Sequence, residues 1–231
     1  PARPTWASGS PPGDRTPMAL DPTLRDALSA VTVASLARAL ARRGVPACAL
    51  SGIAGSGRAV GPAVTLRMIP ARGEVARSLA EAIEAVPEGA VVVVDTGRSG
   101  LALPFGAILA ARLSARGVAG LVTDGCLAAE SGLAVWDAAF APGEGTLQLA
   151  GSGEPIACAG AAVHPGDVVV GGPDGVVVIP ADIAEAVALE AVEQQRLDLW
   201  LTREAEKGAS LATLLPPDAE TLARYEAETR A

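Results

Sequence analysis

The sequence contains only one histidine, His164, and only three cysteines, Cys48, Cys126 and Cys158. A single histidine excludes a metal site built from several histidines of one chain. An odd number of widely spaced cysteines indicates a reduced protein without a disulfide framework, and we therefore expect a cytoplasmic location. Aromatic residues make up 3% of the chain and the net charge is −8, so we expect no nucleic-acid partner.

Long apolar runs are also missing from the sequence. No stretch approaches the roughly 18 apolar residues of a membrane span, and no apolar leader is visible near the first residue. We therefore expect neither a membrane partner nor a signal peptide. Hydrophobic residues nevertheless make up 50% of the 231 residues, with a mean hydropathy of +0.35, which is ample for one domain with a core.

The residue pattern divides the chain into three parts. Residues 1–17, rich in Pro, Gly and Ser, are predicted to be a flexible arm or an expression remnant. Residues 18–212 form the predicted main domain, and residues 213–231 form a C-terminal helical extension that begins near a Pro-Pro break. The apolar spacing predicts helices at about 21–44, 75–86, 105–116, 182–207 and 218–229. It predicts strands near 59–68, 90–95, 119–123, 137–141, 156–163, 167–171 and 175–179.

The order strand, loop, helix, strand over residues 90–123 is typical of a crossover unit, which predicts an α/β fold. The helix expected at 182–207 carries an apolar face and many charges. It either packs one face on its own core or also reaches a neighbouring subunit, and the sequence leaves both open.

The candidate ligand site lies at the carboxyl end of this crossover unit, because ligands of open α/β folds bind where strands end and helices begin. This edge comprises residues 95–100, the start of the 105–116 helix and residues 123–126. Backbone amides at a helix start favour a carboxylate or phosphate, although an ordinary helix start with hydrated amides fits as well. The candidate substrate-binding residues from this argument are Gly106, Ala107, Ile108, Leu109, Thr123 and Gly125.

Two polar side chains at this edge are the candidate catalytic residues. Asp124 follows a predicted buried strand, where an acid can serve as a base, a metal ligand or a turn residue. Arg98 could pair with an anionic ligand or be simply solvated. Cys126 could have a lowered thiol pKa at a helix start, but a small buried residue fits better. His164 precedes a Pro-Gly-Asp turn and fits a surface or capping position.

Four segments together resemble the RraA-like family, which includes the 4-hydroxy-4-methyl-2-oxoglutarate and 4-carboxy-4-hydroxy-2-oxoadipate aldolases. The segments read VGPAVTLRM, EGAVVVVDTG, FGAILAARLSARGVAGLVTDG and HPGDVVVGGPDGVVVIP. Their order and spacing follow the family over roughly residues 20–212. The resemblance implies a swivelling β/β/α domain with an N-terminal helix and a long C-terminal helix.

The resemblance also implies an assembly and a chemistry. Members of the family form trimers, or hexamers of two trimers, with active sites between neighbouring subunits. Active aldolases use magnesium or manganese to cleave a 2-oxo acid to pyruvate, and many decarboxylate oxaloacetate. The metal holds the carboxylate, and an arginine helps to stabilise the developing charge.

This chain departs from the family at the charged positions of that mechanism. The family's arginine falls on Ala128 and its metal-ligating aspartate on Ala129. An acidic position near the start of the 105–116 helix falls on Ala107, and an aspartate of the first helical region falls on Arg38. Alanine offers no oxygen to a hard cation, so we expect no metal and no cofactor. Phe105 replaces a family tryptophan, and with Ala128 it joins the candidate substrate-binding residues.

Three functions remain open. The first is a metal-independent, repurposed lyase, isomerase, dehydratase or cyclase that acts on a small organic substrate in an intersubunit pocket of a homotrimer or homohexamer. The second is a non-catalytic regulatory or binding protein, like the family's ribonuclease inhibitors. The third is a metal-dependent aldolase or decarboxylase that restores the metal with Glu130, Asp124 or another acid such as Asp198.

Overall fold

The computed structural model describes residues 19–45, 48–72, 78–138 and 146–229, and the arm predicted at residues 1–17 lies outside them. The helices are α1 (Pro22–Ala30), α2 (Val33–Arg42), α3 (Leu79–Glu84), α4 (Gly106–Ala115), α5 (Ala184–Glu206), α6 (Leu211–Leu214) and α7 (Ala219–Thr229). The strands are β1 (Ala54–Ser56), β2 (Ala59–Pro70), β3 (Val91–Asp95), β4 (Gly120–Thr123), β5 (Val135–Asp137), β6 (Leu147–Ser152), β7 (Ile156–Cys158), β8 (Ala161–Val163), β9 (Val168–Gly172) and β10 (Gly175–Ile179). No helix in these ranges is both long and apolar enough to cross a membrane.

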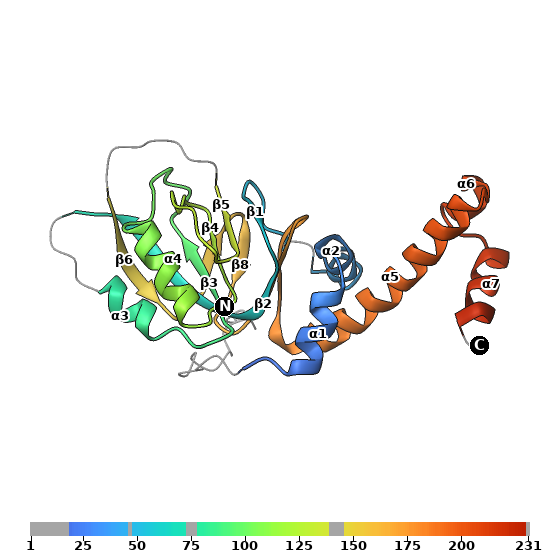
Figure 1. The fold of residues 1–231 in the computed structure, drawn as a ribbon, viewed down its shortest axis with the longest axis horizontal. Coiled ribbons are helices and arrows are strands. Elements are labelled where there is room, and N and C mark those ends of the chain that lie inside the picture. The colour runs from blue at the N-terminus through green and yellow to red at the C-terminus, as the bar shows by residue number, and fades with distance from the viewer. Residues whose placement is uncertain (1–18, 46–47, 73–77, 139–145, 230–231) are drawn as a thin grey trace, which may run out of the picture.

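One curled sheet of eight strands organises the body (Figure 1). Strands β2, β3, β4 and β5 run parallel in that spatial order, and β1 closes the edge antiparallel to β5. The long strand β2 also pairs antiparallel with β9 through its first residues and with β6 through its last residues. Because β2 belongs to both parts of the sheet, it fixes the parallel strands relative to the β9–β10 hairpin.

Three apolar clusters fill the body. Helices α3 and α4 cover one face of the parallel strands, where Leu113 packs with Val92 and Val94. The opposite face packs against the small β7–β8 hairpin around Trp136, whose indole N–H donates to the Gly172 carbonyl at 3.0 Å. Helices α1, α2 and the first half of α5 cover the β9–β10 part in a third cluster. The consecutive valines of β3 are all buried, as the apolar run predicted.

The far half of α5 leaves the body and carries α6 and α7 at its end (Figure 1). Trp200 and Leu201 of α5 pack with Leu214 and Tyr225 in a separate small cluster. Glu204 ties the helices together, because its carboxylate accepts from Lys207 at 2.7 Å and also pairs with Arg224 of α7. We call residues 208–229, folded back on α5 in this way, the hook.

The structure corrects three sequence predictions. The helix expected at 21–44 is two helices, because the Thr32 side chain accepts from the Ser35 amide and starts α2 anew. The strand expected at 156–163 is the β7–β8 hairpin, turned at Ala159 and Gly160, which both have positive φ. Strands β1 and β6 were not predicted, and the strand expected near 137–141 is β5, with residues 139–141 outside the described ranges.

Candidate functional site

Asp124 lies buried where β4 ends, and its carboxylate holds the loop that follows β3. One carboxylate oxygen accepts from the Thr96 amide at 2.7 Å and from the Thr96 hydroxyl at 2.9 Å. The other oxygen accepts from the Arg98 amide at 3.2 Å. Asp124 is only 4% exposed, so these bonds occupy the acid in the folded chain and fix the shape of the 96–98 loop.

Arg98 projects from this loop with a left-handed backbone, φ 53°. Among the residues that the structure describes, its guanidinium makes only long hydrogen bonds, donating to the Ser51 carbonyl at 3.4 Å and to the Ser51 hydroxyl at 3.3 Å. The residue is exposed. Long bonds on an exposed cation are weak, so Arg98 is free to turn toward an anion at the same edge.

The start of α4 lies against the loop after β4. A Cβ on Gly106 would fall 2.0 Å from the Leu127 carbonyl oxygen, so this close approach requires glycine. Phe105 precedes it with φ 56° and provides no side-chain cap. The Leu109 amide donates to the Phe105 carbonyl at 2.9 Å. Within the described part of the chain, this leaves the amides of Gly106, Ala107 and Ile108 as the open donors of the helix start.

The predicted site residues divide into an exposed group, a buried group and two half-buried residues, Gly106 and Leu109. Phe105 is 75% exposed and Ile108 68% exposed, and Arg98, Ala107 and Ala128 are exposed as well.

The buried group lies at the end of β4 and holds the loop that follows this strand. Thr123 and Gly125 are buried, and the Thr123 hydroxyl accepts from the Gly125 amide at 3.0 Å. Burial raises the pKa of the Cys126 thiol, and the nearby Asp137 carboxylate raises it further. Cys126 is therefore a protonated small residue of the core, the interpretation that the sequence favoured.

A divalent cation does not fit this edge of the structure. Positions 107 and 129 are both alanines, so neither supplies an oxygen ligand from its side chain. Asp124 already accepts three hydrogen bonds. Among the residues that the structure describes, no three His, Cys, Asp or Glu side chains come together in a way that could hold a metal ion.

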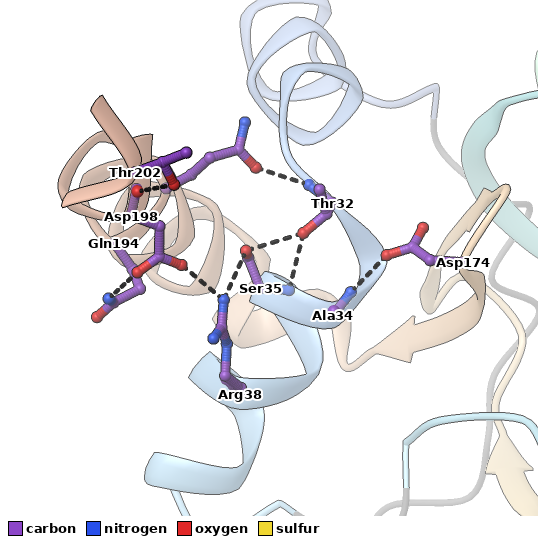
Figure 2. Close-up of polar contacts among 9 residues, drawn as sticks. Thr32, Ala34, Ser35, Arg38, Asp174, Gln194, Asp198 and Thr202 are labelled. Atoms are coloured by element: carbon purple, nitrogen blue, oxygen red, sulfur yellow. Dashed lines mark hydrogen bonds and ion pairs between the residues drawn. The ribbon is translucent and has the colours of Figure 1, made fainter. Parts of the chain in front are cut away.

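Asp198, one of the acids considered as a replacement metal ligand, already has hydrogen-bond partners on α2 and α5 of its own chain (Figure 2). Its carboxylate accepts from the guanidinium of Arg38 of α2 at 2.7 Å and from the side-chain amide (Nε2) of Gln194 at 2.8 Å. The acid on α5 and the cation on α2 therefore neutralise each other. The same close-up shows Thr32 and Ser35 at the start of α2, with the Ser35 hydroxyl accepting from Arg38 at 3.3 Å.

Sequence reasoning missed the partners that shape the site. Thr96 binds Asp124 from 28 positions away, and Ser51 contacts Arg98 from 47 positions away. Asp137 accepts from the Leu127 amide at 2.8 Å and fixes the loop before Ala128. A local signal existed only for the turn in which Asp95 accepts from the Gly97 amide, since Asp-x-Gly is a common turn sequence.

The comparisons with known proteins agree with this geometry. The sequence profile of the RraA-like family, described as Aldolase/RraA, matches residues 22–178. The chain therefore belongs to the RraA-like family, and the predicted family and α/β fold class are confirmed.

Three solved structures share the fold. A Streptomyces coelicolor protein, RraAS2, described as an unusual member of the RNase ES inhibitor RraA protein family, is 27% identical with a TM-score of 0.70. That match covers 79% of this chain and 97% of RraAS2. An uncharacterized Pseudomonas syringae pv. tomato protein is 24% identical, with a TM-score of 0.75 and coverage of 88% and 98%. A structure described under novel cellulases from gut-associated microbes is 20% identical, with a TM-score of 0.63 and coverage of 85% and 90%. The last two show the fold alone, since one fold supports many chemistries.

Proposed function

We propose that this chain is a metal-independent, repurposed member of the RraA-like family. It binds a small organic molecule carrying a carboxylate at the start of α4. The supporting observation is the group of three non-glycine residues with positive φ, Arg98, Phe105 and Ala128, in the two loops that meet there, the loop between β3 and α4 and the loop after β4. Such backbone costs about 1–3 kcal/mol per residue and tends to persist at functional sites.

The ligand's carboxylate would be held by backbone and by one cation. The open amides of Gly106, Ala107 and Ile108 supply donors with the positive end of the helix dipole behind them. Arg98 exchanges its long contacts with Ser51 for a charge-assisted bond to the ligand. The rest of the ligand meets Phe105, Ala107 and Ala128, which form a small, uncharged wall.

Asp124 supports this site by positioning rather than by direct proton transfer. Its carboxylate fixes the amides of Thr96 and Arg98, so it determines where the guanidinium emerges. The reaction class that these residues suit is a lyase, isomerase, dehydratase or cyclase step. Arg98 and the amides would stabilise negative charge that develops on the substrate.

A second copy of the chain completes the pocket in this proposal. Phe105 and Ile108 are large apolar side chains left mostly exposed by the single chain, and a neighbouring subunit would cover them. In the homotrimer or homohexamer implied by the family, such a neighbour would lie at the site. The substrate would then lie in an enclosed, largely apolar space between subunits.

Pyruvate release from oxaloacetate and from 4-hydroxy-4-methyl-2-oxoglutarate tests the chemistry. Each substrate is incubated with magnesium, with manganese and with a chelator. We expect no cation-dependent turnover, because alanines replace the ligands. Cation-dependent turnover would refute metal independence and would favour an aldolase or decarboxylase that has recruited Glu130 or another acid.

Calorimetric titration with pyruvate and oxaloacetate tests the binding site separately. Ala107→Asp places a carboxylate on the open amides, and we expect it to weaken carboxylate binding at least about tenfold. Ala111→Asp, one turn further along the exposed side of α4, carries the same charge and should bind like the wild type. Equal binding by both variants would refute the site.

A non-catalytic regulatory protein is the second candidate, favoured by the distribution of charge. Residues 182–231 hold eleven of the 26 acidic residues but only five of the 18 basic ones. An acidic surface suits a basic protein partner, and the similar RraAS2 is described with the inhibitors of RNase ES. Inhibition of a purified RNase E-type ribonuclease, with no binding of either carboxylate, would favour this function over the first.

A further inference from the structure

A groove on α5 lies outside the candidate site at the start of α4. It has a volume of about 760 Å³, and its lining comes from α2, α5 and α7. The part of α5 in this lining extends from Glu190 to Leu197, which is about 10 Å at a rise of about 1.5 Å per residue. Small-molecule sites have volumes of about 300–1,000 Å³, so the groove has room for an elongated organic ligand.

Two arginines of the groove keep unused donors. The Nε of Arg42 donates to Glu190 at 2.6 Å, and within the described ranges its two terminal amino groups make no hydrogen bond. Arg196 has no ion pair with any residue that the structure describes. Glu190 is fully occupied, because Arg43 donates to its second oxygen at 2.9 Å. Three guanidiniums therefore surround only two carboxylates, those of Glu190 and Glu193, and the excess positive charge favours an anionic group.

Glu193 supplies the complementary acceptor. It lies one turn before Arg196 on α5 and also lines the groove. Its carboxylate has no cation partner in the part of the chain that the structure describes. A carboxylate with open oxygens can accept from ligand hydroxyls, as an acidic residue does from ribose in dinucleotide-binding folds. The groove therefore offers separate places for an anion and for the hydroxyl groups of one molecule.

The lining near the hook adds an aromatic surface. Tyr225 of α7 and Leu197 of α5 are both half-buried against the Trp200 cluster. The Trp200 and Tyr225 rings meet edge to face, with centroids 5.6 Å apart and an interplanar angle of 62°. The Trp200 indole N–H in turn donates to Glu228 at 2.8 Å. These contacts fix the Tyr225 ring in the groove, and a fixed aromatic ring is a surface on which a planar base can stack.

We propose that this groove binds a nucleoside monophosphate. The guanidiniums of Arg42 and Arg196 hold the phosphate, for which their planar donor sets are suited. The ribose hydroxyls donate to Glu193, and the base packs on Tyr225 and Leu197. The bound nucleotide connects α2 of the body with α7 of the hook. The inference does not depend on a ligand at the start of α4, so failure of either proposal leaves the other standing.

Calorimetric titration of the full-length chain with AMP, and with adenosine for comparison, tests the site. We expect AMP to bind with a Kd below about 1 mM. Adenosine lacks the phosphate and should bind at least about tenfold more weakly. Arg196→Gln should weaken AMP binding at least about tenfold. Arg203→Gln makes the same charge change two turns further along α5, at an exposed position outside the groove, and should bind AMP like the wild type.

Two further variants place the ligand. The wild type should bind AMP at least about threefold more tightly than 2′,3′-dideoxy-AMP, and Glu193→Ala should bind both alike. Ala107→Asp blocks the open amides of α4 and should leave AMP binding unchanged. Circular dichroism of every variant should match the wild type.

Hydrogen exchange gives a second readout, because a ligand that connects the hook with the body slows the opening of the hook. The amide hydrogens of α7 should exchange more slowly with AMP than with adenosine at the same concentration. No binding of AMP up to about 5 mM would overturn the proposal, and so would equal AMP binding by Arg196→Gln and Arg203→Gln. Loss of AMP binding in Ala107→Asp, or unchanged exchange in α7, would overturn it as well.

Discussion

Replacement of Asp124 by alanine should destabilise the fold by an amount that the hydrogen bonds predict. Alanine leaves the Thr96 amide and hydroxyl, both buried, without their acceptor at 2.7 and 2.9 Å. A buried donor left unpaired costs about 1–3 kcal/mol. We count these two donors and leave out the longer bond from the Arg98 amide at 3.2 Å. The free energy of unfolding should then fall by about 3 kcal/mol. Asparagine keeps one oxygen for Thr96 and should lose about 1 kcal/mol.

Urea unfolding measures this loss as a lower midpoint with an unchanged slope. All variants are compared at one protein concentration, because self-association adds to apparent stability. Glu130→Ala, an exposed acid of the neighbouring loop, is the control and should stay within about 0.5 kcal/mol of the wild type. If Asp124→Ala also stays within about 0.5 kcal/mol, the carboxylate does not hold the 96–98 loop, and its assignment as a positioning residue is refuted.

Three further measurements address other features. Gly106→Ala should lower the free energy of unfolding by about 2 kcal/mol, because its Cβ would lie 2.0 Å from the Leu127 carbonyl oxygen; an unchanged urea midpoint would contradict this contact. The three cysteines are buried, and burial raises the pKa of each thiol, so Ellman's reagent should detect no thiol in the native chain and three per chain in urea. Hydrogen bonds from Lys207 and Arg224 lower the pKa of the Glu204 carboxyl. The ionised carboxylate therefore stabilises the folded chain at pH values above the ordinary pKa of about 4.3, and this stabilisation is lost as the pH falls through the lowered pKa. The melting temperature of Glu204→Gln should therefore lie below that of the wild type at pH 7 and approach it below about pH 4, and a difference that persists in acid would argue against the ion pairs.

Residues with a local signature were predicted well from the sequence. The valines of β3 indicated a buried strand, and the Gly117 region correctly ended α4. The helical spacing from Leu24 to Leu40 hid the break at Thr32, because Thr32 also fits a continuous helix and only its hydrogen bond to Ser35 reveals the cap. Strand β6 escaped prediction because its pairing with the end of β2 joins segments far apart in the chain.

The candidate site, too, was predicted from the sequence only in part. Its position followed from the order of strand, loop and helix, whereas the close approach of Gly106 to the Leu127 carbonyl oxygen appears only in the folded chain. The sequence could not indicate that Thr96 occupies the Asp124 carboxylate or that Arg38 pairs with Asp198, because these partners meet only in three dimensions. The role of Asp124 changes for this reason from a possible base to a proposed positioning residue.

The hook has a consequence for how the molecule opens. Its core is small, built around Trp200, Leu201 and Leu214, and over the described ranges it shares no apolar cluster with the body. Amide hydrogens of β3 lie between β2 and β4 and should exchange with solvent only when the whole body unfolds. The amide hydrogens of α7 should exchange through a separate opening of lower free energy, in which the hook detaches from α5 while the body stays folded. We therefore expect two cooperative units of unequal stability, and a protease should first cut the chain near Gly208, where α5 ends and the hook begins.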